Sequence, residues 1–438
     1  MDSAAKSDVG YPPSAQAWWA VSVFAVAAVL SYTDRQILSL LVDPIRSDLN
    51  ITDTQISIVQ GAAFAVLYSV IGLPLGWVAD RVQRRLLLVA AVLTWSAGTA
   101  ACGFAGSFEE LFGARLFVAL GEAALAPAVM SLLADYFSPA RRATATGVFF
   151  TGMVIGAGAA ISIGGALLEA ARQGLFASLP VVGALAPWRA VLVLAGGAGL
   201  LVAMAMLTLI EPRRRLARAD NSASLAAFGQ EFRSKAYVLI PLYLALAIGS
   251  IVDYAVLSWT PALLTRVYSF SAGDVAVALG GVAIAAGLIG TPTGGFLTDW
   301  VTQRFGAAMR TRLAFALSLL GLAATPIGVY SSANVVLAAV FLWILISSCV
   351  GTIGIATILD LLPDDSRGLA TSTIAFGNTI VGLTIGPTVV AVVTDYFYRA
   401  PEAVGLALTS VMVPVVLTMC LLFFSAMQRS ARSPAVAA

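Results

Sequence analysis

Long apolar segments constrain this chain more than any other feature of its sequence. A helix needs roughly 20 apolar residues to cross a bilayer, and runs of that length recur along almost the whole chain. Charged residues make up 11% of the chain and hydrophobic residues 59%, whereas soluble domains average about 25% and about 45–50%. We therefore predict an all-α membrane protein. Its twelve transmembrane helices are expected at about 17–42, 54–79, 86–106, 109–136, 141–171, 188–210, 236–265, 272–301, 311–330, 333–361, 366–397 and 402–427.

The basic residues predict the orientation of these helices. If the N-terminus is cytoplasmic, 18 Lys and Arg residues fall in inner segments, 5 in outer segments and 2 within spans, which accounts for all 25. Because cytoplasmic loops are enriched in Lys and Arg, both termini are expected in the cytoplasm. The predicted division is a cytoplasmic tail 1–16, a six-helix bundle 17–211, a cytoplasmic linker 212–235, a second six-helix bundle 236–428 and a cytoplasmic tail 429–438.

Several motifs occur twice. Ser31-Tyr-Thr-Asp34 recurs in the second half of the chain as Ser250-Ile-Val-Asp253. At the same separation, Gly76-Trp-Val-Ala-Asp80 recurs as Gly295-Phe-Leu-Thr-Asp299. A slightly larger separation relates Asp135 and Arg142 to Asp360 and Arg367. Apolar helices share a small alphabet, but chance does not readily keep Asp and Arg in step. We infer a duplication, which would place a substrate site near mid-membrane between the two halves.

Two motifs in the N-terminal half resemble those of the major facilitator superfamily. Gly76-x-x-x-Asp80-Arg81-x-x-Arg84-Arg85 is similar to the loop motif G-x-x-x-D-R-x-G-R-R, with Gln83 in place of glycine. Arg115, followed by Gly121 and Glu122, resembles the R-x-x-x-G-x-G motif of helix 4, although Ala119 replaces the first glycine. The resemblance covers essentially the whole chain. It implies the major facilitator fold, in which twelve helices form two pseudo-symmetric six-helix bundles.

Within that superfamily, Tyr32-Thr-Asp34-Arg35 is similar to the N-Y-x-D-R of the Spinster family, with Ser31 in place of asparagine. Spinster resemblance implies transport of lysophospholipids and of sphingoid lipids such as sphingosine 1-phosphate. Organic-anion symporters of the same superfamily share Y-x-D-R, so a carrier of sugar acids is the alternative. Compact loops resemble a bacterial member, which implies the bacterial inner membrane as its location.

Five ionisable residues fall well inside predicted spans: Asp34, Arg35, Arg115, Glu122 and Asp253. A charge at mid-bilayer costs at least about 2.5–3.5 kcal/mol, so these side chains are expected to face partners or a cavity. Arg115 and Glu122 are seven residues apart and share a helix face. Since the first and fourth helices run in opposite directions, Asp34 and Arg35 should lie at roughly the depth of Arg115. The first four residues are therefore expected to form one cluster in the N-terminal half.

This cluster has two interpretations. It is either a set of structural ion pairs, or a coupling site in which Asp34 and Glu122 exchange protons while Arg35 and Arg115 bind the acidic group of a substrate. Burial raises the pKa of a carboxyl group and a neighbouring guanidinium group lowers it, so a motion that separates the two would trigger proton uptake. Tyr32 and Asp253 are further candidate substrate ligands, and Asp253 is equally explained as a polar contact of its helix.

A cytoplasmic gate is implied by the loop motif. Asp80 is expected to contact basic residues and helix N-termini when the inner side is closed. For Arg84, Arg85, Arg141 and the run 213–215, the alternative is that they serve only topology and contact with anionic lipids. We favour this alternative for the run 213–215 and not for Asp80 and Arg81. The candidate gate residues are Gly76, Asp80, Arg81, Arg85, Asp135, Arg142, Asp299, Arg304, Asp360 and Arg367.

The sequence argues against several other classes of function. It contains no histidine, which excludes histidine triads and proton relays, and it has no metal-binding motif and no phosphate-binding loop. We therefore expect a monomeric transporter, not an enzyme or a receptor-like protein, with no cofactor, no metal and no nucleic-acid partner. Its expected partners are the bilayer, protons supplied by a proton gradient, and a lipid or small amphipathic anion as substrate.

Overall fold

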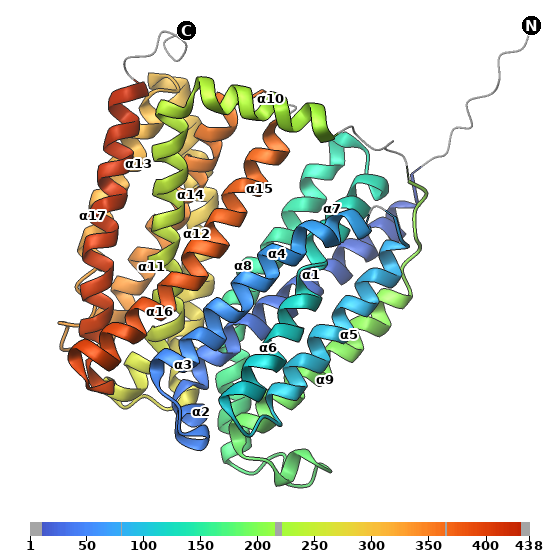
Figure 1. Ribbon diagram of the computed structural model, residues 1–438, viewed down its shortest axis with the longest axis vertical. Helices are drawn as coiled ribbons and strands as arrows, with labels where there is room; N and C mark the ends of the chain where they lie inside the picture. The colour runs from blue at the N-terminus through green and yellow to red at the C-terminus, as the bar shows by residue number, and fades with distance from the viewer. Residues whose placement is uncertain (1–10, 80, 215–220, 364–365, 431–438) are drawn as a thin grey trace, which may run out of the picture.

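The computed structural model describes residues 11–79, 81–214, 221–363 and 366–430, and the regular secondary structure of these residues is helical. Two groups of helices lie side by side (Figure 1). The N-terminal bundle contains α1 (Ser14–Gln36), α2 (Val42–Leu49), α3 (Asp53–Ser57), α4 (Ala63–Ala79), α5 (Arg84–Cys102), α6 (Phe108–Glu122), α7 (Leu125–Tyr136), α8 (Pro139–Arg172) and α9 (Pro187–Leu207). The C-terminal bundle contains α11 (Ala236–Tyr268), α12 (Ala272–Phe305), α13 (Met309–Gly321), α14 (Ala333–Leu361), α15 (Arg367–Gly377), α16 (Thr384–Val392) and α17 (Val404–Ser430). The predicted fold class, two six-helix bundles, is confirmed.

Eleven of the predicted spans, among the residues described, are helical segments long and apolar enough to cross a membrane. The remaining span, expected at 311–330, is shorter than predicted: α13 and the 3-10 turn η4 (Leu322–Ala324) end at Ala324. Pro326 follows soon after, and proline cannot continue a helix because it has no N–H to donate. Beyond it the backbone packs tightly, since a Cβ on Gly328 would lie 2.0 Å from the carbonyl carbon of Gly405.

The predicted helix 109–136 is interrupted. It consists of α6 and α7, separated by a turn at Ala123 and Ala124. Pro127 explains the interruption, because a proline ring clashes with the carbonyl group four residues earlier, here that of Ala123, and removes one helical hydrogen bond. As a result, Glu122 is the last residue of α6 and lies where the helix ends.

Small residues allow the two bundles to pack closely along α8 and α12. The hydroxyl of Ser162 donates a hydrogen bond to the carbonyl oxygen of Ala276 at 3.0 Å. A Cβ on Gly165 would lie only 2.5 Å from the carbonyl oxygen of Ala272. Small residues at helix contacts in membranes permit this backbone approach. Gly158 and Gly165 of α8 therefore lie at the boundary between the bundles.

The two ends of the molecule differ. At one end, here called the linker end, α10 (Asn221–Ser234) connects the bundles; the opposite end carries α2 and is called the α2 end (Figure 1).

A second contact between the bundles joins the π-helical turns η2 (Ile58–Ala62) and η6 (Asn378–Leu383). There, a Cβ on Gly61 would lie 2.2 Å from the carbonyl oxygen of Leu383. Turns of this kind widen a helix locally and are frequent at functional sites.

Candidate functional site

An ion pair between α1 and α6 forms the centre of the N-terminal bundle. Nη2 of Arg35 lies 2.8 Å from Oε2 of Glu122, and the hydroxyl of Ser31 donates to the same oxygen at 2.7 Å. All three residues are buried, with Glu122 only 1% exposed. The structure therefore brings together two of the charged residues that the sequence places inside spans. With Asp34 and Arg115, they are called the central cluster below.

Arg115 contacts backbone oxygens of α1. Its guanidinium group donates to the carbonyl oxygens of Asp34, at 3.0 Å, and of Arg35, at 3.4 Å. Both oxygens of the Asp34 carboxyl group are buried, and neither has a hydrogen-bond partner among the described residues. The hydroxyl of buried Thr99 lies next to this carboxyl group, but the two do not form a hydrogen bond of normal geometry. The central cluster thus contains one paired carboxyl group, Glu122, and one that is buried without a hydrogen bond, Asp34.

Aromatic rings surround the guanidinium group of Arg35. Its Cζ lies 4.4 Å from the ring centroid of Phe64, 4.8 Å from that of Tyr32 and 5.0 Å from that of Tyr68. Cations over aromatic faces within about 6 Å are stabilised, by about 2 kcal/mol or more where water is excluded. The rings therefore fix the position of Arg35 and shield it from the space between the bundles.

That space holds a cavity of about 310 Å³, called the interface cavity below. It is bounded by side chains of α1, α8, α11, α12 and α14, so both bundles contribute to it. Tyr32 and Asp253, two of the predicted substrate ligands, line it. Oδ1 of Asp253 accepts hydrogen bonds from Nε1 of Trp343 at 3.0 Å and from the hydroxyl of Ser347 at 2.6 Å. Arg35 and Arg115 are not part of its lining, because both are buried within the N-terminal bundle.

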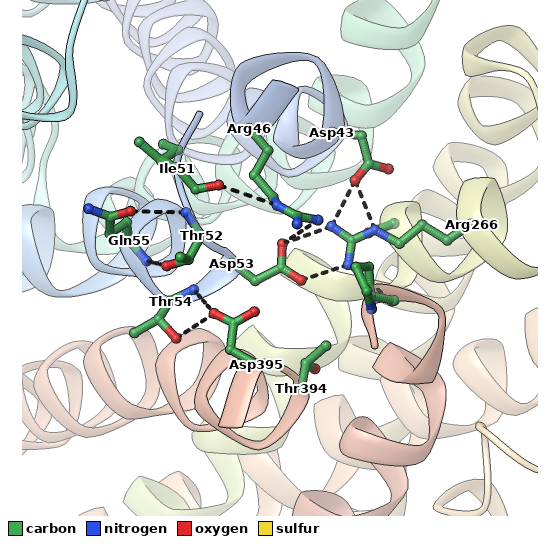
Figure 2. Close-up of polar contacts among 12 residues, drawn as sticks. Asp43, Arg46, Ile51, Thr52, Asp53, Thr54, Gln55, Arg266, Thr394 and Asp395 are labelled. Atoms are coloured by element: carbon green, nitrogen blue, oxygen red, sulfur yellow. Dashed lines mark hydrogen bonds and ion pairs between the residues drawn. The ribbon is translucent and has the colours of Figure 1, made fainter. Parts of the chain in front are cut away.

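Ion pairs join the two bundles at the α2 end (Figure 2). Arg266 near the end of α11 contacts Asp43 of α2 and Asp53 of α3, each at 2.7 Å. We call these three residues the α2-end cluster. Beside it, Asp395 accepts hydrogen bonds from the backbone N–H and the hydroxyl of Thr54, both at 2.7 Å (Figure 2). Asp53 is completely buried, so its contact with Arg266 is shielded from water.

Sequence analysis did not identify the α2-end cluster. The relevant signal was the presence of Asp43, Asp53 and Arg266 at ends of predicted helices that lie on the same side of the membrane. Arg266 and Asp53 belong to different halves of the chain, and neither position is part of a recognised motif. Only the packing of α11 against the first helices reveals that they meet.

At the linker end of the N-terminal bundle, Arg84 binds two acidic residues. It is 1% exposed, it forms an ion pair with Asp135, and its Nε donates to Glu211 at 2.9 Å. Of the two interpretations of Arg84, contact with lipid headgroups does not fit, because its side chain is buried and bound to two carboxylates. Arg85, chosen as a gate residue, donates through Nη1 to the carbonyl oxygen of Leu209 at 2.9 Å.

The C-terminal bundle repeats this arrangement. Arg310 forms an ion pair with Asp360, as Arg84 does with Asp135. Arg142 donates to the carbonyl oxygen of Ala134 at 2.8 Å, and its counterpart Arg367 donates to that of Leu359 at 3.3 Å. Each of these contacts lies within one bundle. The duplication inferred from the sequence relates Asp135 to Asp360 and Arg142 to Arg367, but it did not pair Arg84 with Arg310.

The other predicted gate residues are placed as follows. Asp80 lies outside the described residues. The guanidinium group of Arg81 lies 3.4 Å from the ring centroid of Trp77, and a Cβ on Gly76 would lie 3.9 Å from the Cβ of Pro127. Asp299 and Arg304 are exposed near the end of α12.

Comparison with known proteins agrees with this architecture. The model of the Major Facilitator Superfamily matches residues 24–387. An MFS-type efflux pump of Mycolicibacterium smegmatis is 27% identical over 386 residues, 87% of this chain and 85% of that protein. The protein spinster of Drosophila melanogaster is 23% identical over 330 residues, 70% of this chain and 52% of that protein. A hexuronate transporter of Bacillus subtilis is 25% identical over 392 residues, 84% of this chain and 86% of that protein.

Among solved structures, this chain is similar to a bacterial homologue of the human lysosomal transporter Spinster, crystallised in an inward-facing and unoccupied conformation. The TM-score is 0.81 at 23% identity, with 95% of this chain and 98% of that chain covered. The same homologue in an occupied conformation gives a TM-score of 0.75. This likeness concerns the fold.

Proposed function

This chain belongs to the Major Facilitator Superfamily, and we propose that it is a proton-coupled secondary transporter that moves a single-chain amphipathic lipid by alternating access. The coarser statement, a multi-pass membrane transporter that is not an enzyme, follows from the family and the fold. The proposal adds three points: the substrate is a lipid, its transport is coupled to protons, and the linker end of the helices faces the cytoplasm.

The proposed orientation places the linker end in the cytoplasm of a bacterial cell. The positive-inside rule supports it, because the basic residues are concentrated in the segments at that end. With this orientation, the α2-end cluster closes the outer side. The ion pairs described at the linker end each lie within one bundle, so they leave the bundles free to separate there. The arrangement is that expected of a carrier whose interface cavity opens toward the cytoplasm.

One observation carries the proton-coupling proposal: the carboxyl group of Asp34 is completely buried, and neither of its oxygens accepts a hydrogen bond from the described residues. A buried ionised carboxylate without hydrogen bonds costs several kcal/mol, so we infer that Asp34 takes up a proton when the α2 end is closed. Glu122, paired with Arg35, is the second proton carrier. A rearrangement of α1 against α6 that releases Arg35 would allow Glu122 to bind a proton and Arg35 to meet an acidic substrate group.

Two substrate classes are supported by relatives. The similarity to spinster and the apolar lining of the interface cavity favour a lipid. The similarity to a hexuronate transporter favours sugar acids, which remain the second candidate. In both cases Arg35 would bind the substrate by bidentate pairing with its phosphate or carboxylate group.

The test is uptake into proteoliposomes with and without an inward proton gradient, using labelled sphingosine 1-phosphate, lysophosphatidylcholine and a hexuronate. We expect gradient-driven lipid movement in the wild type and its loss in Asp34→Asn. Glu109→Gln, which changes an exposed carboxyl group at the start of α6, serves as the control and should behave as wild type. Uptake of hexuronate alone would assign the chain to the sugar-acid carriers. Gradient-driven uptake that survives in Asp34→Asn would refute the role of Asp34.

A further inference from the structure

The interface cavity has one charged residue in its lining. All of its lining residues belong to the described part of the chain, and among them only Asp253 is ionisable at neutral pH. Tyr32, Ser347 and Ser348 supply the neutral polar groups, and the remaining lining is apolar or glycine. A ligand in this cavity therefore meets a carboxylate, not the arginines that the motifs suggest.

Asp253 has donors on one oxygen only. Trp343 and Ser347 both donate to Oδ1, and they are neutral. Among the described residues, no basic side chain forms an ion pair with Asp253 and no donor contacts its Oδ2. Elsewhere in the membrane-spanning part of the protein, Glu122 has Arg35 as a cation partner. Asp253 has no cation partner within the described ranges, although a charge in a protein interior is normally paired with an opposite charge.

The apolar part of the lining complements this carboxylate. Met153 and Val154 of α8 face the cavity from one bundle, and Leu257 and Ile344 face it from the other. The volume of about 310 Å³ lies at the lower end of the range of about 300–1,000 Å³ for small-molecule pockets. The cavity thus offers one anionic point on an otherwise apolar surface.

We infer that the interface cavity binds the ammonium group of a single-chain amphipathic amine at Asp253, with the hydrocarbon chain against α8, α11 and α14. An ammonium group has three N–H donors and no acceptor, which matches the free Oδ2 of Asp253. Hydrogen bonds between charged groups are roughly twice as strong as neutral ones. This inference rests on the proposed transport function and specifies its substrate class.

The same geometry disfavours the sugar acids. A carboxylate substrate placed in the interface cavity would be repelled by Asp253, and its hydroxyl groups would find few partners among the apolar side chains. A lipid that carries both an amine and an acidic group remains compatible, because Tyr32 lines the cavity and also contacts the guanidinium group of Arg35.

Binding to the purified full-length protein tests this inference without a proton gradient. The probe is tritiated sphingosine, a single-chain amine without a phosphate, competed by tetradecylamine, tetradecanol and tetradecanoate. A charge-assisted hydrogen bond is roughly twice as strong as a neutral one, so the wild type should prefer the amine to the alcohol by about tenfold or more, equivalent to at least about 1.4 kcal/mol. Asp253→Asn should abolish that preference, whereas Asp253→Glu should retain it.

The asparagine variant isolates the charge, because its Oδ1 still accepts from Trp343 and Ser347. Its thermal unfolding midpoint, compared with that of Glu109→Gln, verifies that the fold is intact. A wild type without amine preference, or an Asp253→Asn variant that keeps it, would overturn the inference. Amine preference without any lipid transport would support the inference and refute the proposed function. Proton-driven lipid transport by a protein without amine preference would refute the inference and support the proposed function.

Discussion

Arg266 on α11 forms a bidentate ion pair with Asp53 on α3, with its Nη1 and Nη2 atoms 2.7 and 2.8 Å from the two carboxylate oxygens (Figure 2). The pair joins residues of different bundles, and it is almost fully buried. Any state in which the α2 end opens must break it.

We predict that Arg266→Ala opens the α2 end. The substitution leaves Asp53 buried, with Arg46 as a more distant cation at 3.4 Å, and removing one partner of a buried ion pair costs about 3–5 kcal/mol. Spin labels at Gln173 and Glu402, exposed on different bundles at this end, should move apart. Arg189→Ala is the control, because Arg189 pairs with Asp48 within one bundle at the same end. Unchanged label distances in Arg266→Ala would contradict the prediction.

Gly61→Ala should disfavour the same closed state by a different cause. The added methyl group would lie 2.2 Å from the carbonyl oxygen of Leu383, a backbone atom that cannot rotate away, so η2 and η6 must separate. We expect a transport rate reduced by about tenfold or more, equivalent to at least about 1.4 kcal/mol. Gly113→Ala adds a methyl group where no atom lies within 4 Å and should leave the rate unchanged. Equal rates in the two variants would disprove the steric argument.

Arg84→Ala should destabilise the N-terminal bundle. The change removes the cation shared by Asp135 and Glu211, and breaking a buried ion pair by removing one partner costs about 3–5 kcal/mol. The thermal unfolding midpoint should fall by several degrees. Arg141→Ala removes an exposed arginine at the same end of the molecule and should have little effect. If both variants unfold at the wild-type temperature, Arg84 contributes charge but no stabilising contact.

Two substitutions of Arg35 separate its charge from its shape. Arg35→Lys keeps a positive charge near Glu122 but loses the planar group that stacks on Phe64, and we expect a modest loss of stability, about 1–2 kcal/mol. Arg35→Gln also removes the charge and should destabilise more, because Glu122 is then buried without a cation. Unfolding midpoints measure both. A glutamine variant as stable as the lysine variant would show that the ion pair adds nothing to stability.

The sequence alone predicted the helices, their division into two bundles and the repeat that relates them, because these follow from local properties. The length of an apolar run determines whether a segment spans a membrane, and a duplicated motif such as that of Asp34 and Asp253 is visible without coordinates. The interruption at Ala123 was also readable in principle from Pro127, although we predicted a continuous helix there.

Which charged side chains contact one another was decided by the tertiary structure. The sequence predicted that Asp34, Arg35, Arg115 and Glu122 form one cluster, but which acid meets which base depends on the rotation of each helix about its axis. A rotation by one residue turns a side chain by roughly 100°, and apolar sequences all around these helices leave that rotation undetermined. Three features could therefore not be predicted. The carboxyl group of Asp34 accepts no hydrogen bond from the described residues, Arg84 binds Asp135, and Arg266 reaches Asp53 from the other half of the chain. These contacts become defined only when the helices pack against one another.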